Sequence, residues 1–531
     1  MSPVSRAWFD WVVLVAVCAT IVMRPTVLAR GGELVGARIQ PAAPRIKPPQ
    51  IVKAQFARPL EQVAPREFEG PLTDGQSILS GETAPIDLPA AFRLAGVENP
   101  QIQIARQRVT ESVAVRQLAA AQILPNLNGG TNYDNHTGNL QQSNGNILAV
   151  NRSALYAGAG ANAIAAGTVN IPGLVWNQNL SDTFFSYLQS RQLVQERQFA
   201  NQATNNEMLL QVAVAYLELL RAEQARAIAL LIRKDAQEVA RLTANYAATG
   251  QGRKADADRA ATELRQRQTE VLAIEGDILT ASARLAQLLN LDPSVRLRAA
   301  EDVAIPTSLV ADSISLRELI AIGLMQRPEM GERRAAIQRA LLELDGAKLL
   351  PFSPNVIVGF SAGTFGGGSN LITPTFGNFG ARSDFDAVAY WTLRNLAVGN
   401  RALIDASAAR YNISNLEQVA VLNRVRSEVA AAHARTQARW AQIAINEKAV
   451  QSGQEGFEED FNRIRAREGL PIEVLNNLRL LARARMEYLG AIIDYNRAEY
   501  ELYVALGQPP ANAVTRPITP PTKDGPELPS P

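Results

Sequence analysis

The chain has 531 residues, with 53 Lys and Arg against 51 Asp and Glu, so its formal net charge is only +2. A charge this close to zero argues against nucleic acid as a partner. Two histidines and one cysteine are too few for a Cys/His metal cluster, a disulfide framework or a Cys–His catalytic pair. We expect no metal, no cofactor and no enzymatic activity.

The first 29 residues have the pattern of a secretory signal peptide. Arg6 precedes a mostly apolar run from Trp11 to Met23, and a small-residue cleavage site ends at Ala29. The run is short for a membrane-spanning helix. Cys18 lies in a segment similar to a lipoprotein acylation box, but Val17 is bulky where such a box has Gly or Ala. We favour export with cleavage after Ala29, and lipidation of Cys18 is the alternative.

Two proline-rich segments flank a structured body. Residues 30–85 and 509–531 are rich in proline without a sustained period, which predicts extended, largely unstructured chain. The body between them repeats itself. Ile86–Ala95, closing at Asn99-Pro100, is echoed by Ser315–Leu324, closing at Arg327-Pro328. We predict two helix–strand–strand–helix–helix repeats, over 86–300 and 315–508.

Each repeat is expected to contain two strands. After a helix over 88–123 that breaks near Asn99 and ends at Pro125, the composition shifts to Asn, Gly, Thr and aromatic residues. Strands are predicted around Tyr133 and His136 and over 174–180, joined by a loop from 138 to 172. The second repeat has counterparts at 355–360 and 387–393, joined by a loop over 361–384.

Long helices follow the strands. Residues 183–246 contain no Pro or Gly, which corresponds to roughly 95 Å of continuous helix. Residues 401–468 repeat this, interrupted only by Gly453 and Gly456. The return helices carry alternating three- and four-residue spacings, which predict left-handed supercoiling against neighbouring helices. The first of these seams comprises Ala257, Ala260, Leu264, Arg267, Val271, Ile274, Ile278, Ala281, Leu285 and Leu288, and the second Val474, Leu478, Leu481, Arg485, Tyr488, Ile492, Tyr495, Glu499 and Leu502.

Glycine-containing turns separate the long helices from the return helices. Gly250 and Gly469 are predicted to supply the left-handed residue that stops each long helix, and Pro471 suits the first turn of the next helix. Asp256 and Glu473 would then lie in a first helical turn, where a carboxylate is favoured.

In this order, the motifs resemble the TolC-like outer membrane efflux proteins (outer membrane factors) over about residues 86–508. The resemblance lies in the Leu-x-x-Ala-x-x-x-Ala…Asn-Pro opening, the Leu-Pro before the first strand and the Tyr…Gly…Asp turn. The closing segments 285–292 and 502–507 match as well. The chain departs from the family in its long proline-rich lead and in Arg259, which stands where family members carry a second acidic residue.

The resemblance implies an α+β membrane protein: a long antiparallel coiled-coil α-barrel joined to a transmembrane β-barrel. A homotrimer would contribute four strands per protomer to one 12-stranded barrel in outer-membrane lipid, with a helical tunnel in the periplasm. The turns would meet a periplasmic adaptor (membrane fusion protein) and an inner-membrane pump. The implied function is a passive exit duct for efflux or type I secretion, and the substrate stays open. The alternative is a non-channel periplasmic coiled-coil scaffold.

Charged and glycine residues at the turns are the candidate gate or adaptor contact. They are equally consistent with a solvated helical hairpin, in which first-turn carboxylates only stabilise a helix. This set comprises Gly250, Gly252, Arg253, Lys254, Asp256, Asp258, Arg465, Arg467, Glu468, Gly469 and Glu473.

Aromatic and seam residues supply further candidates. Trp176, Tyr187, Tyr390 and Trp391 would anchor a barrel at the membrane interfaces or simply pack at strand–helix junctions. Arg267, Arg485 and Glu499 would face a tunnel lumen or, as we favour, set the register of the seams. His136 and His433 are expected to be bystanders.

Overall fold

The computed structural model describes residues 77–79, 82–161, 170–372 and 376–513. The expected signal peptide over 1–29, Cys18, most of the proline-rich lead and most of the C-terminal tail lie outside these residues. At the end of the lead the expectation of unstructured chain is wrong, because β1 (Thr83–Ile86) pairs in parallel with β7 (Arg296–Ala299).

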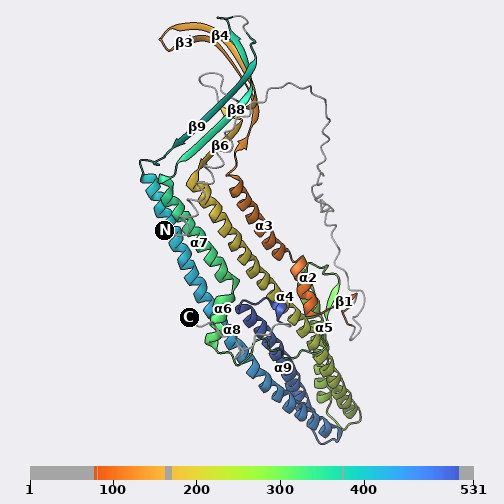
Figure 1. The fold of residues 1–531 in the computed structure, drawn as a ribbon. Coiled ribbons are helices and arrows are strands. Elements are labelled where there is room, and N and C mark those ends of the chain that lie inside the picture. Colours follow the sequence, from red (N-terminus) through yellow and green to blue (C-terminus); the bar gives the residue numbers. More distant parts are fainter. Residues whose placement is uncertain (1–76, 80–81, 162–169, 373–375, 514–531) are drawn as a thin grey trace. The chain divides into compact units, whose positions relative to one another are not determined.

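The helices occur in the same order in both halves of the chain (Figure 1). The first half contains α2 (Leu88–Glu98), α3 (Pro100–Ala121), α4 (Leu180–Ala248) and α5 (Lys254–Leu289). The second half contains α6 (Leu316–Gln326), α7 (Pro328–Leu349), α8 (Val398–Arg465) and α9 (Pro471–Ala505). Short 3₁₀ turns occupy Leu350–Phe352 and Pro510–Asn512. The predicted break at Asn99 is confirmed, since its side chain caps α3 by accepting from the backbone N–H of Gln101 and Ile102.

The two long helices are confirmed and run slightly further than predicted. α4 has 69 residues and α8 has 68, and Gly453 and Gly456 lie inside α8 without breaking it. α5 packs along α4, and α9 packs along α8. Every residue of the two predicted seams is buried or half-buried, as expected for coiled-coil packing. Within the described part of the chain, no helix is both long and apolar enough to cross a bilayer.

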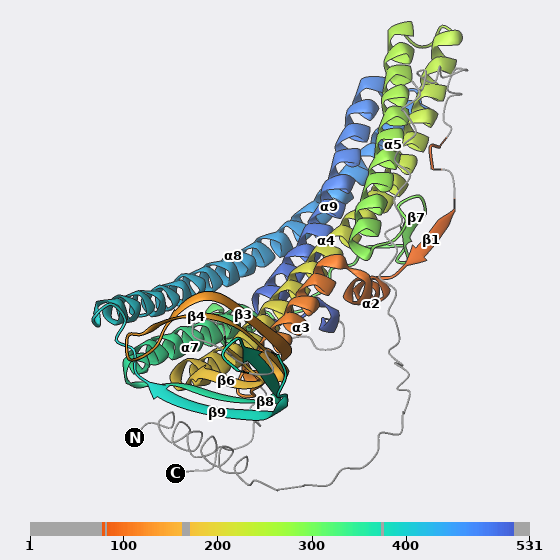
Figure 2. The same cartoon turned by 90° about the horizontal axis from the view of Figure 1, so that it is seen from above.

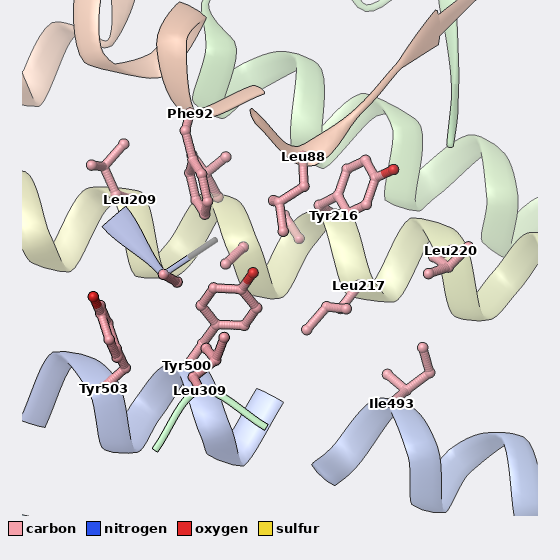
Figure 3. Close-up of a cluster of buried hydrophobic side chains, with 14 of the residues drawn as sticks. Leu88, Phe92, Leu209, Tyr216, Leu217, Leu220, Leu309, Ile493, Tyr500 and Tyr503 are labelled. Carbon is pink, nitrogen blue, oxygen red and sulfur yellow. The ribbon is translucent and has the colours of Figure 1, made fainter. Parts of the chain in front are cut away.

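Two apolar cores hold the helices together. The larger core joins α2, α4, α5 and α9 with the segment that links the two halves, and includes Phe92, Tyr216, Tyr500 and Leu309 (Figure 3). Phe92 and Tyr500 meet edge to face with ring centroids 6.3 Å apart, although 408 positions separate them in sequence. The smaller core lies among α4, α8 and α9 near the turns and includes Val239, Phe457 and Leu478.

The remaining strands form one antiparallel sheet. They are β2 (Asn126–Leu127), β3 (Gly129–Gln141), β4 (Ile147–Ala161), β5 (Ile171–Pro172), β6 (Leu174–Asn179), β8 (Asn355–Ser369) and β9 (Gly380–Tyr390). β4 and β6 pair with successive parts of the same edge of β8, and β3 and β2 pair with β4 and β6 in turn. β9 pairs with the other edge of β8. The strands therefore follow four antiparallel tracks: β2–β3, β4–β6, β8 and β9.

Both predicted strand loops are too long, and the structure corrects them. β4 lies entirely within the expected loop 138–172, while β8 extends to Ser369 and β9 begins at Gly380, inside the expected loop 361–384. Glycine and asparagine are typical of loops, but the glycines here permit close strand pairing. A Cβ atom on Gly158 would lie 2.5 Å from the Cα of Gly363 on β8. Only a residue without a side chain fits at that approach.

Candidate functional site: the helical turns and the two faces of the sheet

The first turn has the predicted backbone geometry. Gly250 has a φ of 71°, in the left-handed region, and the carbonyl of Tyr246 accepts from the backbone N–H of Gln251 and Gly252, both at 2.9 Å. A Cβ at Gly252 would lie 3.0 Å from that of Tyr246, so the turn is tight as well as left-handed. Arg253 immediately precedes α5 and Lys254 is its first residue.

The second turn departs from the prediction. Its left-handed residue is Arg467, with a φ of 67°, and Gly469 does not have a positive φ. The backbone N–H groups of Glu468 and Gly469 both return to the carbonyl of Arg463, at 2.9 and 3.2 Å, so the reversal occurs at 467. Gly469 is required for lack of space and not for its φ angle. A Cβ there would lie 3.0 Å from the Arg463 Cβ and 3.1 Å from the Ile464 nitrogen.

The first-turn carboxylates are placed as predicted. Asp256 lies in the first turn of α5 and pairs with Arg259 at 2.8 Å. Glu473 lies in the first turn of α9, accepts from the backbone N–H of Leu470 at 3.3 Å and lies 3.7 Å from an Arg463 nitrogen. Local contacts therefore satisfy both carboxylates, as the helix-stabilising interpretation requires.

The other charged candidates divide into two groups. The Arg465 guanidinium lies over the Phe461 ring, 4.5 Å from its centroid, and 3.9 Å from Glu238 on α4. The remaining five project from exposed positions, and within the described part of the chain none forms an ion pair. These are Arg253, Lys254, Asp258, Arg467 and Glu468.

The structure brings the two turns together. The Tyr246 hydroxyl, at the end of α4, donates to the backbone carbonyl of Ile464 at the end of α8, at 3.2 Å. Ile464 is itself buried in the smaller core. The sequence motif contained Tyr246, but nothing local indicates that its hydroxyl ties one hairpin to the other.

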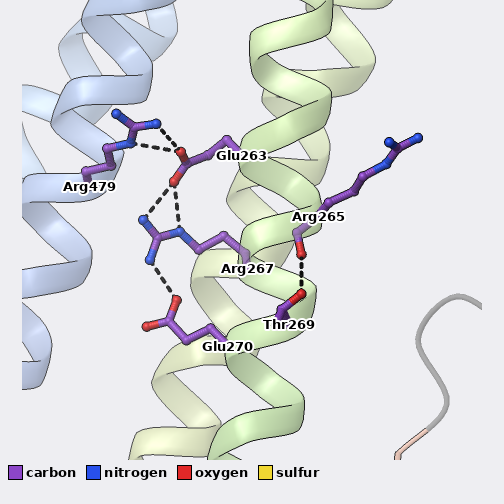
Figure 4. A network of polar contacts seen from close by, with 6 residues as sticks. All are labelled: Glu263, Arg265, Arg267, Thr269, Glu270 and Arg479. Carbon is purple, nitrogen blue, oxygen red and sulfur yellow. Dashed lines mark hydrogen bonds and ion pairs between the residues drawn. The ribbon is translucent and has the colours of Figure 1, made fainter.

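A buried charge network links the hairpins further from the turns (Figure 4). Glu263 on α5 is 1% exposed. It pairs with Arg267 on its own helix at 2.7 Å and with Arg479 on α9 at 2.6 Å. Arg267 also pairs with Glu270 at 2.7 Å. Burial alone would raise the pKa of Glu263, but the hydrogen bonds from Arg479 and Arg267 outweigh it and hold the pKa below its ordinary value.

The sequence predicts one member of this network, Arg267, and misses the other three, Glu263, Glu270 and Arg479. Arg267 was expected to set register on the first seam, and its pairing within α5 agrees with that. Glu263 and Arg479 each lie next to a seam residue, Leu264 and Leu478. A charged residue beside a seam is usually solvated, so the pattern alone gives no reason to pair them.

The other two charged seam residues have distinct partners. Arg485 donates to the side chain of Gln454 on α8, and burial lowers its pKa. Glu499 Oε2 accepts from the backbone N–H of Leu309 at 2.8 Å and of Val310 at 3.1 Å. Glu499 therefore holds the segment that links the two halves of the chain against α9.

The four candidate interface aromatics gather where the sheet meets the helices. Trp176 lies on β6, Tyr187 near the start of α4, and Tyr390 at the end of β9. Trp391 follows β9 directly, is exposed, and donates from Nε1 to the carbonyl of Phe352 at 3.2 Å. Their placement near the strand–helix junctions does not decide between the two interpretations.

The strand register separates charge from apolar surface. Residues directly opposite each other in an antiparallel pair share a face, and successive residues alternate. The face that contains Tyr156 also contains every charged residue or histidine of the described sheet strands, namely Asp134, His136, Arg152, Arg382, Asp384 and Asp386. We call this the charged face.

The opposite face, which we call the uncharged face, carries apolar and small residues on β8 and β9 and mostly uncharged polar residues on β3. Phe360 on β8 faces Phe385 on β9, and Val358 is flanked by Ala387 and by Trp176. Phe360 and Phe385 are exposed in the single chain, whereas Tyr156 on the charged face is fully buried. The sheet is curved (Figure 2). Of its exposed aromatic residues, Tyr133, Phe360 and Phe385 lie on the uncharged face, and Tyr390 lies on the charged face.

Comparison with known proteins finds relatives in structure only. No protein-family model matches the sequence, and no curated protein matches it. The solved structure of CusC, described with its transmembrane channel formation, is 19% identical and covers 81% of this chain and 94% of its own, with a TM-score of 0.65. The CmeC outer membrane channel of Campylobacter jejuni is 13% identical, with coverages of 82% and 90% and a TM-score of 0.65.

A third structure shows the same likeness. The open-state MtrE outer membrane channel of Neisseria gonorrhoeae is 17% identical, with coverages of 82% and 94% and a TM-score of 0.59. Each match extends over most of both chains, so the likeness includes the helices and the sheet together. As the motifs predicted, the chain has the fold of the TolC-like outer-membrane channels, and the shared trimeric barrel stays a prediction.

Proposed function

We propose that the chain forms a passive exit duct in the outer membrane, as a homotrimer in which three copies of the four-track sheet close one 12-stranded barrel. The observation that carries this proposal is the separation of charge between the two faces of the sheet. A sheet in lipid must present a face without charge and must leave no unpaired edge. The uncharged face meets the first need, and joining β9 of one copy to β3 of the next meets the second.

The helices would continue the duct into the periplasm. α4 and α8 would each span on the order of 100 Å, and the described chain has the fold of known outer membrane channels. We propose that the chain arose by duplication of the units 86–300 and 315–508, which have the same element order. The duct would serve efflux or type I secretion through a periplasmic adaptor and an inner-membrane pump.

The turns would then form the gate and the adaptor contact. Tyr246 and the Glu263–Arg267–Arg479 network hold the α4–α5 hairpin against the α8–α9 hairpin. A partner that binds better when the hairpins are apart would shift the population toward an open tip. The five exposed charges at the turns, Arg253, Lys254, Asp258, Arg467 and Glu468, are free to contact such a partner.

The native mass of protein extracted from outer-membrane fractions in mild detergent tests this function. We expect a trimer that dissociates on heating and that conducts ions when inserted in a planar bilayer. A monomer, or protein released without detergent, would contradict the duct and favour the periplasmic scaffold. A trimer that does not conduct would support the proposed assembly and contradict the proposed channel function.

A further inference from the structure

A pocket lies between α6, α8, α9 and the linker that precedes α6. Its volume is about 310 Å³, at the small end of ligand-binding cavities. We call it the α8–α9 pocket. Its lining includes Asp312 from the linker, Leu319 from α6, His433 and Trp440 from α8, and Tyr495 and Glu499 from α9. The pocket is remote in sequence from the helical turns and from the sheet strands.

Glu499 presents an unsatisfied oxygen at this pocket. The residue is 1% exposed. Its Oε2 atom accepts the two backbone N–H groups of the linker, but Oε1 is buried and accepts no hydrogen bond of standard geometry within the described residues. Burial raises the pKa of Glu499, and the backbone donors and the nearby Tyr495 hydroxyl only partly oppose this. The Tyr495 hydroxyl is the nearby donor, but it does not meet standard hydrogen-bond geometry to Oε1. A buried carboxylate oxygen so weakly satisfied is costly, and a ligand that donates to it would remove that cost.

Two aromatic rings stand beside the carboxylate. The centroids of Trp440 and Tyr495 lie 5.0 Å apart, with the ring planes tilted by 50°. Trp440 is 53% exposed, so part of its ring is open to an incoming molecule. Aromatic faces attract cations, and tryptophan does so most strongly.

The charges of the lining residues favour a positively charged ligand. Asp312 and Glu499 contribute two carboxyl groups, and neither lysine nor arginine lines the pocket. The arginines nearby on α8 are engaged elsewhere, because Arg435 pairs with Glu501 at 3.0 Å and Arg439 with Asp494 at 3.3 Å. Leu319 and other apolar residues of the lining leave room for a hydrocarbon group beside the charge.

We propose that the α8–α9 pocket binds a small organic amine, whose ammonium group donates to Glu499 Oε1 and whose apolar part packs against Trp440 and Tyr495. A bound amine would also fasten the linker to α8 and α9, because the linker and both helices contribute to the lining. The site does not depend on the duct proposed above, since it lies within one chain.

The test uses 2-phenylethylamine as the probe and 2-phenylethanol as its uncharged analogue of nearly equal shape. Binding of each to the purified full chain in detergent is measured by isothermal titration calorimetry. We expect the amine to bind more tightly than the alcohol by about ten- to one-hundred-fold, the range expected for a hydrogen bond to a charged group. Glu499→Gln should remove most of this difference. Glu487→Gln, on the same helix but outside the lining and paired with Arg483, should preserve it.

A second variant keeps the test independent of the linker contact. Because Glu499 also accepts from Leu309 and Val310, its replacement perturbs the linker as well as the pocket. Trp440→Leu leaves those hydrogen bonds in place and should weaken amine binding by about three- to thirty-fold, as expected for loss of a cation–π contact. Equal affinities for amine and alcohol, unchanged binding in both variants, or no saturable binding of the amine by the folded protein would each overturn the proposal.

Discussion

At the scale of single residues, Glu263 shows how a buried charge can bind two helical hairpins together. An unpaired carboxylate at 1% exposure would cost several kcal/mol. Here Arg267 and Arg479 supply donors to both of its oxygens, and Arg479 comes from the other half of the chain. Separating the hairpins would strip Glu263 of its Arg479 partner and leave its Arg267 contact, which is local to α5.

Removing this charge should favour the open tip. Glu263→Gln and Arg479→Gln should each weaken the closed state by about 1.5 kcal/mol, or roughly ten-fold in the open population. The measurement is channel conductance in planar bilayers. The increase in conductance of the double variant should be no larger than that of either single variant, because both substitutions remove the same contact. Glu270→Gln, at the half-exposed end of the network, is the matched control. Additive effects in the double variant would contradict the coupling.

The same residue predicts a pH dependence. The pKa of Glu263 is lowered when the hairpins are together. Its contribution to the closed state is therefore complete above the ordinary glutamate pKa, about 4.3, and is lost as the pH falls through the lowered value. Conductance of the wild-type protein should rise with acidification in that window, and the Glu263→Gln variant should lack this component. An identical pH profile in both proteins would show that other groups control the change.

At the scale of elements, the two faces of β9 can be tested with neighbouring residues. Phe385 lies on the uncharged face and Asp386 on the charged face. Phe385→Arg should disfavour insertion by about 2–4 kcal/mol if its level is near the bilayer midplane, whereas Asp386→Arg should insert normally. The readout is the fraction of protein in the outer membrane that migrates as a heat-labile trimer. Equal insertion of the two variants would refute the assignment of the faces.

The turns make a second prediction about elements. Gly469→Val would force a side chain against the backbone of α8, and Gly250→Val would place a β-branched residue at positive φ. We expect each substitution to lower the free energy of unfolding by about 1–3 kcal/mol. Gly276→Val on α5 is the control, because a Cβ there meets nothing within 4 Å. Thermal unfolding of the purified variants should rank Gly276→Val as the mildest, and equal losses at all three sites would remove the special role of the turns.

At the scale of the whole molecule, the sheet leaves β3 and β9 as its outer tracks. The proposed trimer joins these tracks between copies, and cysteine cross-linking can detect that junction. In a Cys18→Ser background, which contains no other cysteine, Asn135→Cys would be combined with single cysteines at Ser383, Phe385 or Ala387.

One of these pairs should give covalent trimers under mild oxidation. All four residues lie on the uncharged face of the described sheet, so a correct register places two thiols within disulfide reach. Asn135→Cys paired with a cysteine at Phe360, on the central track β8, is the control and should not cross-link. Cross-linking of the control alone would exclude the proposed junction.

The sequence by itself determined the parts of this protein that repeat along the chain. Helix lengths, both seams, the capping break at Asn99 and the first turn at Gly250 follow from local periodicity and from backbone preferences within a few residues. The family resemblance rests on the same short motifs in their order, and the solved channel structures share the fold of this chain.

Tertiary structure alone decided the features that depend on distant partners. The segment 147–161 becomes a strand because β3 and β8 pair with it, and its composition does not show this. Glu263 meets Arg479 across 216 positions, and Glu499 meets Leu309 across 190. Contacts of this kind depend on how the two halves of the chain pack, and no local pattern records that packing.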